Sequence, residues 1–259
     1  MPVLGLGTWQ LPKGRTTQDA VRAALAAGYR LIDTATLYAN EADVGRAIAD
    51  SGLPREEVFI TTKLWNDDHG FDSALRAFEK SRQALGVEQV DLYLIHWPVA
   101  ERRLESWRAL EQLQQEGRCR SIGVSNFGVG HLRELLAASS TVPSVNQVEF
   151  SPFLHQRELH QFCREHGIQL EAYSPLTRGR RLDDLGLAHL ARDTGRTPAQ
   201  QLLRWGLQHS IEEIPKSSRQ ERIAENAQLF DFELSPAQMA TLDALDAGYR
   251  TTRDPGEMP

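Results

Sequence analysis

The chain has 259 residues, of which 41% are hydrophobic and 25% charged. Its formal net charge is −6, and its pI is near 5.8. This length allows one large α/β barrel domain or two smaller domains. The acidic balance argues against a general nucleic-acid binder or a protein of anionic membranes, because both need a positive field.

The cysteines and the N-terminus bear on location. Cys119 and Cys163 are far apart and lie in no C-x-x-C pattern. We therefore expect no disulfide framework and no cysteine zinc site, which fits a reducing cytoplasm. The N-terminus lacks a basic segment followed by a long apolar one, and no apolar run approaches the length of a membrane span. The sequence favours a cytoplasmic protein.

Short apolar runs typical of strands alternate with helical patterns along the chain. We expect strands at residues 4–7, 29–32, 58–62, 90–95, 121–124, 145–150, 169–173 and 212–214. We expect helices at 16–27, 41–51, 72–85, 104–116, 129–138, 156–166, 185–194, 198–209, 220–228 and 236–245. The tail from residue 248 to residue 259 is polar and should be irregular.

Strands that alternate with helices form a parallel sheet. Eight such units in one chain predict a (β/α)8 barrel that occupies residues 1–259 as a single domain. The alternative is an open, doubly wound sheet. That fold would call for a G-x-G-x-x-G turn, but Gly5-Leu6-Gly7 is followed by Thr8-Trp9 and lacks the third glycine.

In such a barrel the active site lies at the C-terminal ends of the strands. One polar residue after a strand is most simply a turn or a helix cap, but here every predicted strand is followed by polar or aromatic side chains. These residues are Thr8, Trp9, Asp33, Lys63, His96, Trp97, Ser125, Asn126, Gln147, Glu149, Tyr173, Ser174, Lys216, Ser217 and Ser218.

Four residues suggest a chemistry. Tyr38 follows Asp33 closely, and Lys63 and His96 end neighbouring strands. A phenol near an ammonium is a better acid, a carboxylate holds the lysine in place, and a histidine can orient a carbonyl oxygen. This set suits carbonyl reduction. Taken singly, the same residues could be a surface tyrosine, a solvated lysine and a structural histidine.

Other site chemistries find less support. No H-E-x-x-H or similar spacing predicts a metal, and the remaining histidines fall on expected loops or helices. Ser125 lacks the G-x-S-x-G pattern of serine hydrolases.

Several stretches resemble the aldo-keto reductases over nearly the whole chain. They are GLGTWQL at 5–11, LIDTATLYANEADVG at 31–45, ITTKLW at 60–65, DLYLIHWP at 91–98, IGVSNF at 122–127, NQVEFSP at 146–152, EAYSPL at 171–176 and IPKSSRQERIAEN at 214–226. The likeness is strongest to the prokaryotic branch with 2,5-diketogluconate reductases and broad aldehyde or methylglyoxal reductases.

The resemblance implies roles for individual residues. The catalytic tetrad would be Asp33, Tyr38, Lys63 and His96, with Tyr38 as the general acid. NADPH would be bound by Thr8, Trp9, Ser125, Asn126, Gln147, Tyr173, Ser174, Pro175, Leu176, Lys216, Ser217, Ser218, Arg222, Glu225 and Asn226. The substrate pocket would be lined by Trp9, Trp65 and Trp97, for which core packing is the alternative.

Lys216 and Arg222 also have a physical reason to bind a phosphate. Cations and hydroxyls just before a helix N-terminus make a good phosphate site, and a 2′-phosphate favours NADPH over NADH. Without the surrounding motif, we would interpret the same residues as solvent-exposed basic side chains at the start of a helix.

Departures from the family concern loops. We expect the N-terminal hairpin that closes the barrel floor in the family to be missing, and the segments after Pro98 and Leu176 are short. We expect an open pocket, a broad range of small carbonyl substrates and, as in the family, a monomer. The alternatives are a dedicated 2,5-diketogluconate reductase and a non-catalytic NADPH-binding regulatory protein.

Overall fold

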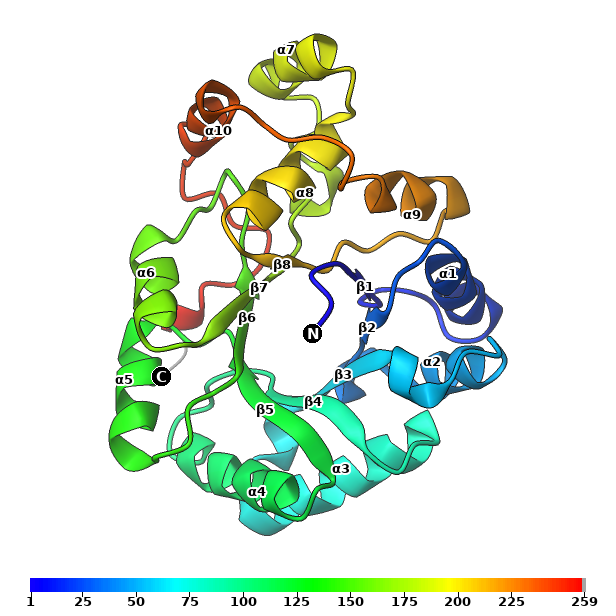
Figure 1. Ribbon diagram of the computed structural model, residues 1–259. Coiled ribbons are helices and arrows are strands. Elements are labelled where there is room, and N and C mark those ends of the chain that lie inside the picture. Colours follow the sequence, from blue (N-terminus) through cyan, green and yellow to red (C-terminus); the bar gives the residue numbers. More distant parts are fainter. Residues whose placement is uncertain (258–259) are drawn as a thin grey trace.

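A computed structural model describes residues 1–257 of the chain, and its strands follow one another around a barrel (Figure 1). The strands are β1 (Gly5–Gly7), β2 (Leu31–Asp33), β3 (Phe59–Leu64), β4 (Val90–Ile95), β5 (Cys119–Ser125), β6 (Val145–Glu149), β7 (Gln169–Tyr173) and β8 (Glu212–Glu213). They form one 8-stranded sheet in the order β1 to β8, and every neighbouring pair is parallel. The predicted (β/α)8 barrel is confirmed.

The first and last strands meet just before β1. Leu4 forms a parallel bridge with Glu213, and the Glu213 backbone N–H donates to the Val3 carbonyl over 2.9 Å. Further along, the Gly7 N–H donates to the Pro215 carbonyl over 3.2 Å. These contacts link the β1 region to the β8 region, so the sheet forms a nearly closed barrel.

Helices surround the sheet on its outer side (Figure 1). They are α1 (Arg15–Ala26), α2 (Glu41–Ala49), α3 (Phe71–Leu85), α4 (Arg103–Gln115), α5 (Val129–Ala138), α6 (Arg157–Glu165), α7 (Leu185–Thr194), α8 (Pro198–Gln208), α9 (Gln220–Ala227) and α10 (Pro236–Asp243). None of the helices in the described part of the chain is long and apolar enough to cross a membrane.

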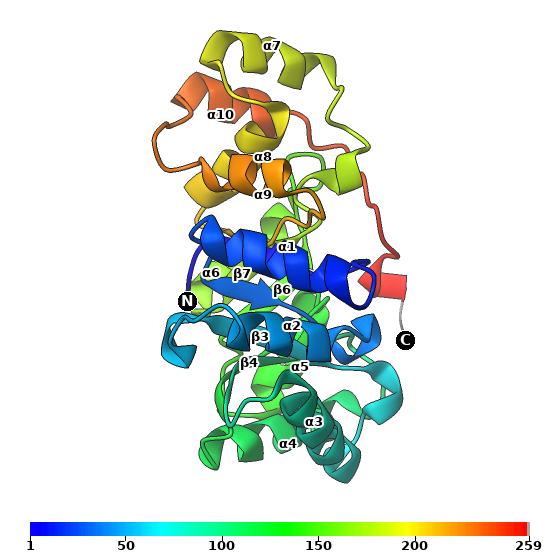
Figure 2. The same cartoon turned by 90° about the vertical axis from the view of Figure 1, so that its right-hand side faces the viewer.

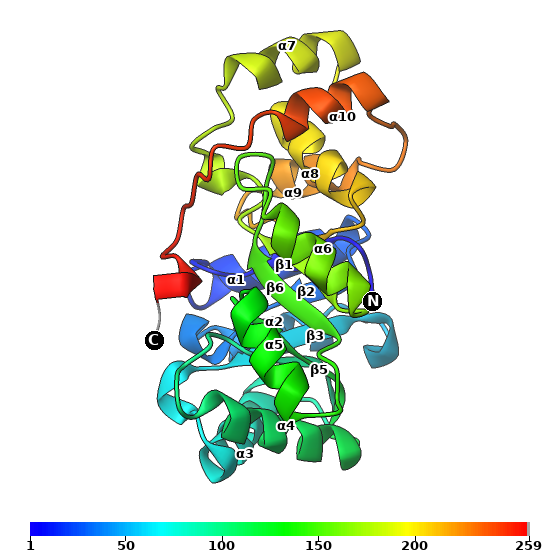
Figure 3. The ribbon, with the colours of Figure 1, turned by 90° about the vertical axis from the view of Figure 1, so that its left-hand side faces the viewer.

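One side of the molecule carries additional layers. Figures 2 and 3 show α7 and α10 stacked beyond α8, with the C-terminal segment running back from α10 along the barrel. This segment is irregular up to a short 3-10 helix at Pro255–Glu257. Residues 258 and 259, the last of the predicted irregular tail, lie outside the described residues.

Most element boundaries lie within two residues of those predicted from the sequence. The clearest difference is in β2, which begins at Leu31 rather than Tyr29 and includes Asp33 as its last residue. Asp33 pairs in register with Thr61 of β3 and is 2% exposed. The interpretation that Asp33 lies beyond a buried strand is therefore wrong, because backbone pairing with β3 carries the strand through it.

The core fills the space between strands and helices. Trp107 on α4 and Trp205 on α8 are both fully buried. Thr197 caps α8: its hydroxyl accepts the Gln200 N–H, the Gln200 side chain accepts the Thr197 N–H, and Pro198 stands in the first turn.

Candidate active site

A cavity of about 820 Å³ opens at the C-terminal ends of the strands. Almost all the residues predicted to form the site line it: Trp9, Asp33, Tyr38, Trp65, His96, Trp97, Ser125, Asn126, Gln147, Tyr173, Ser174, Pro175, Leu176, Lys216, Ser217, Ser218, Arg222, Glu225 and Asn226. The exceptions are Lys63, which lies behind Asp33 and Tyr38, and Thr8. The Thr8 side chain is fully buried, and its hydroxyl donates to the Asp33 carbonyl over 2.9 Å.

The centre of the cavity holds a buried ion pair next to a phenol. The Lys63 ammonium lies 2.7 Å from each carboxylate oxygen of Asp33 and 3.3 Å from the Tyr38 hydroxyl. It also donates to the Thr34 carbonyl over 2.9 Å. Lys63 comes from β3, Asp33 ends β2, and Tyr38 ends the 3-10 turn Thr36–Tyr38 that follows β2. Adjacent parallel strands thus bring the three groups together.

Burial sets the protonation of the phenol. The pKa of Tyr38 is raised well above its ordinary value, by burial first and then by the negative charges of Asp33 and Glu171. Burial outweighs the effect of the Lys63 ammonium that the sequence led us to expect, so the pKa of Tyr38 lies above its ordinary value rather than below it. Tyr38 therefore carries its proton at neutral pH.

His96 directly follows the last residue of β4. Its pKa lies well below the ordinary value, because of burial first and then the positive charge of Lys63, so the ring is neutral. Its Nδ1 has no hydrogen-bond partner within the described chain. The ring packs edge-on against Tyr38 and Trp65, with centroid distances of 5.8 and 5.2 Å. A neutral imidazole at this place can meet a carbonyl oxygen without adding charge.

An amide and hydroxyl network covers the neighbouring wall. The Ser125 hydroxyl donates to the Gln147 carbonyl over 2.8 Å, and the Asn126 amide donates to the His96 carbonyl over 2.9 Å. The Tyr173 hydroxyl donates to Asn126 Oδ1 over 2.7 Å. These bonds fix side chains that are predicted to bind NADPH.

The sequence missed Glu171, which extends this network below the cavity. The Gln147 amide donates to Asp33 Oδ2 over 2.8 Å and to Glu171 Oε2 over 3.2 Å. Glu171 is fully buried, and its pKa is raised well above the ordinary value by burial and by Asp33. A signal was present: the twofold period of a strand puts Glu171 and Tyr173 on the same face of β7.

Several cations line the cavity near the start of α9. Lys216, Ser217 and Ser218 precede α9, and Arg222 lies in its first turn. The pKa of Lys216 is lowered by burial. Arg178, a residue that the sequence did not single out, lines the same cavity from the loop after β7. The only sequence feature that could have indicated a cavity position for Arg178 was the group of basic residues in the same loop.

Two further residues that are predicted to bind NADPH, Glu225 and Asn226, lie close to α8. The Glu225 carboxylate accepts the Thr197 hydroxyl over 2.7 Å, and Asn226 is buried beside it. Thr197 also lines the cavity. The N-cap of α8 therefore also positions Glu225, which is predicted to bind NADPH.

The C-terminal segment is fastened to the rim by Glu149. One carboxylate oxygen accepts the N–H and hydroxyl of Thr251, both over 2.6 Å. The other accepts the N–H and hydroxyl of Thr252 over 3.1 and 2.5 Å. Thr252 Oγ1 lies 3.1 Å from the Tyr173 hydroxyl, and Thr252 and Arg253 line the cavity. No local sequence pattern predicted this connection.

Comparison with known proteins places the chain among oxidoreductases. A family model described as "Aldo/keto reductase family" matches residues 3–247. The chain is 49% identical over 258 residues to a glyoxal reductase of Bacillus subtilis (strain 168), covering 100% of this chain and 94% of that protein.

A second relative and a solved structure support the same family assignment. The chain is 47% identical to a 9,11-endoperoxide prostaglandin H2 reductase of Trypanosoma cruzi (strain CL Brener), covering 98% of this chain and 91% of that protein. The crystal structure of a Gox0644 mutant in complex with NADPH superposes with a TM-score of 0.94 at 43% identity, covering 99% of this chain and 94% of that one.

Proposed function

This chain belongs to the aldo/keto reductase family and is an NADPH-dependent oxidoreductase, and we propose that it reduces aldehydes and ketones to alcohols with Tyr38 as the proton donor. The observation that carries the proposal is the contact of Lys63 with both Asp33 and Tyr38 at the base of the cavity.

The residues present fit the cofactor. The amides of Asn126 and Gln147 line the cavity, as do the cations Lys216 and Arg222. The first pair suits a carboxamide, and the second suits a phosphate at the 2′ position. When bound, NADPH supplies a hydride to the carbonyl carbon.

The proton comes from the chain itself. Tyr38 keeps its proton at neutral pH because its pKa is raised by burial and by the charges of Asp33 and Glu171. It can therefore donate to a carbonyl oxygen that gains negative charge. The Lys63 ammonium, 3.3 Å from the phenol oxygen, stabilises the phenolate that this transfer leaves. Neutral His96 positions the carbonyl oxygen beside Tyr38.

We also propose that the enzyme accepts a broad range of small carbonyl substrates. Trp9, Trp65 and Trp97 give the cavity an apolar wall next to Tyr38. The connection from β4 to α4 is short, so few residues are available to narrow that wall. The names of two relatives indicate substrates of different size: a glyoxal for one and 9,11-endoperoxide prostaglandin H2 for the other.

We also propose that the enzyme works as a monomer in the cytoplasm. All four proposed catalytic residues come from one chain, and both cysteines are buried thiols rather than a disulfide. Sedimentation of the purified enzyme at assay concentration tests the first point, and a dimer as the main species would refute it.

The Tyr38→Phe variant tests the mechanism. It removes one hydroxyl and keeps the ring that packs against Trp9 and His96. We expect turnover of a reactive aldehyde to fall by about 100-fold or more, within the range typical of general acids, while NADPH binding followed by fluorescence stays unchanged. Turnover close to that of the parent enzyme would refute the role of Tyr38.

A further inference from the structure

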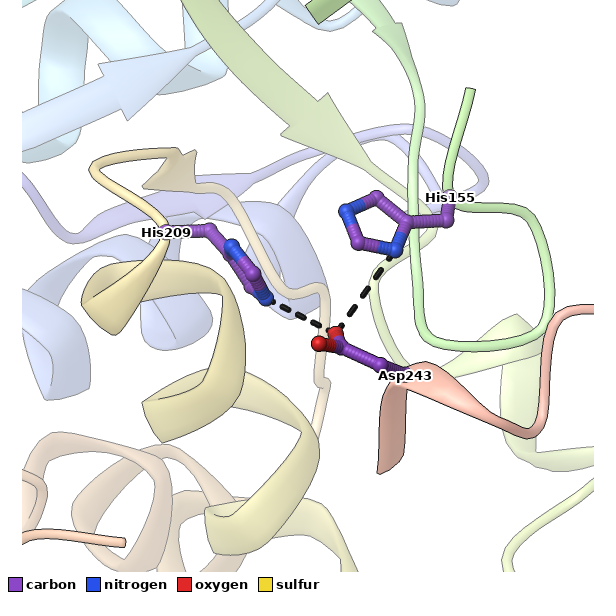
Figure 4. A group of neighbouring side chains, drawn as sticks. All are labelled: His155, His209 and Asp243. Atoms are coloured by element: carbon purple, nitrogen blue, oxygen red, sulfur yellow. Dashed lines mark hydrogen bonds and ion pairs between the residues drawn. The ribbon is translucent and has the colours of Figure 1, made fainter. Parts of the chain in front are cut away.

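A second cluster of chemically active side chains lies outside the reductase cavity (Figure 4). His155 follows β6 in the loop before α6, His209 caps the C-terminus of α8, and Asp243 ends α10. His209 Nε2 lies 2.9 Å from Asp243 Oδ1, and His155 Nδ1 lies 3.6 Å from the same oxygen. One possible ligand atom from each residue falls within 4.8 Å of the other two. None of the three lines the reductase cavity.

Part of the cluster is explained by hydrogen bonding alone. The Trp205 indole N–H donates to Asp243 Oδ1 over 2.8 Å, and His209 Nε2 lies within hydrogen-bond distance of the same oxygen. Burial opposes ionisation of Asp243, but these bonds bring its pKa below the ordinary value. The carboxylate is therefore charged and fixed in direction. His155 is not needed for any of this.

His155 is the unexplained member. Its side chain is 4% exposed, and its Nδ1 has no hydrogen-bond partner in the described structure. The ring is held by the rings of Phe150, Trp205 and His209, with centroid distances of 5.5, 5.0 and 4.8 Å. A buried nitrogen without a partner carries a free-energy cost. Figure 4 shows this nitrogen directed at the Asp243 carboxylate.

The protonation states suit a metal ligand set. Burial, followed by the positive charges of Arg157 and His209, lowers the pKa of His155 to about 4. His155 is thus neutral at pH 7, and the tautomer protonated on Nε2 offers the Nδ1 lone pair. Two imidazole nitrogens and one carboxylate form a donor set that zinc and similar divalent ions accept.

We propose that His155 Nδ1, His209 Nε2 and the Asp243 carboxylate bind one divalent transition-metal ion of the zinc type. Ligand atoms on a tetrahedral zinc ion with bonds of ~2.0–2.1 Å are about 3.3 Å apart, and the 2.9 and 3.6 Å separations lie on either side of that value. Metal binding through Nε2 requires the His209 tautomer that carries its proton on Nδ1. The Trp205 N–H continues to orient the carboxylate, as outer hydrogen bonds do at metal sites.

The position of the site indicates a structural role. It joins the loop before α6, the end of α8 and the end of α10, which are far apart in sequence. The His209 and Asp243 side chains are 22% and 29% exposed, which gives an ion access from solvent. A metal here stabilises the packing of α10 on the barrel and leaves the reductase chemistry at Tyr38 untouched.

The test uses untagged, full-length enzyme freed of metal with a chelator. Titration with Co²⁺ should give the visible absorption of a low-coordinate cobalt site that saturates at one equivalent, and Zn²⁺ should displace it. Zn²⁺ should also raise the melting temperature of the protein. Absence of saturable binding of either ion would overturn the proposal.

Variants decide which residues hold the ion. His155→Gln should weaken Zn²⁺ binding by about 100-fold or more, because one of three metal bonds is lost. The matched control is His189→Gln, which alters an exposed histidine paired with Asp193 on α7 and should bind as the parent does. Equal Zn²⁺ affinity in His155→Gln and the parent would overturn the assignment.

A second variant covers the case in which His155→Gln fails to fold. Asp243→Asn keeps the size of the side chain and an oxygen for the Trp205 N–H, and it should also lose Zn²⁺ binding. Circular dichroism shows that each variant is folded. NADPH-dependent turnover by metal-free Asp243→Asn should equal that of the metal-free parent, so failure of the metal site and failure of the proposed reductase mechanism give different results.

Discussion

The Lys63 ammonium lies 2.7 Å from both carboxylate oxygens of Asp33, and the two side chains are 0% and 3% exposed. A buried pair of this kind costs free energy to desolvate, and little of that cost returns as net stability. The ion pair instead fixes the position of the Lys63 ammonium, which also contacts the Tyr38 hydroxyl. The ion pair therefore links the stability of the barrel to its proposed chemistry.

Breaking this pair should destabilise the fold. Lys63→Met removes the charge but retains most of the side-chain volume, and it leaves the Asp33 carboxylate buried without its cation. We expect a loss of roughly 3–5 kcal/mol in the free energy of unfolding, measured by urea denaturation. The double variant Asp33→Asn/Lys63→Met should recover most of this stability and remain inactive. A single variant as stable as the parent would contradict this account of the pair.

Glu212 should make stability depend on pH. It is a buried β8 residue whose pKa is raised to about 7, chiefly by burial, and its Oε2 has no partner in the described structure. In the unfolded chain Glu212 ionises near its ordinary pKa of 4.5. The folded state holds more protons between these two values, so this residue lowers stability as pH rises from about 4.5 to about 7.

Glu212→Gln should remove that penalty. The variant should be more stable than the parent by up to roughly 3 kcal/mol at pH 8, and equally stable below pH 4.5, where Glu212 is protonated in both states. Glu56→Gln, at an exposed position, is the control and should show no such trend. Urea unfolding at several pH values checks this, and a stability difference independent of pH would argue against it.

Arg222 should select between the two nicotinamide cofactors. Arg222→Ala is expected to raise KM for NADPH by about 10- to 100-fold, the effect of losing a charged hydrogen bond worth roughly 1.5–3 kcal/mol. KM for NADH should hardly change, because it lacks the 2′-phosphate. Arg120→Ala, at an exposed site on β5, controls for net charge. Equal losses with both cofactors would mean that Arg222 does not contact this phosphate.

Glu149 should hold the C-terminal segment against the cavity. Glu149→Gln replaces an acceptor-only carboxylate that binds Thr251 and Thr252 through four hydrogen bonds. The amide nitrogen cannot accept, so one threonine loses its partner. We expect trypsin to cleave after Arg250 about tenfold faster, as followed by mass spectrometry. The exposed Glu158→Gln serves as the control, and unchanged cleavage in Glu149→Gln would exclude this role.

Local patterns were enough to predict the order of elements. The apolar runs that became β4 and β7, Val90–Ile95 and Gln169–Tyr173, were located without error. The shortest strands were located less well, since β2 extends to Asp33 through pairing with β3, a contact that no local pattern encodes. The identity of the residues at strand ends followed from the barrel rule, because all C-terminal ends meet at one face.

The sequence by itself determined the barrel, the family and the set of polar residues at its working end. Only the tertiary structure decided which of them touch. Gln147 joins Asp33 to Glu171, the Thr8 hydroxyl turns to the Asp33 backbone, and His155 meets His209 and Asp243. Periodicity fixes which face of a strand or helix a side chain occupies, whereas contacts between distant segments depend on register and on closure of the sheet.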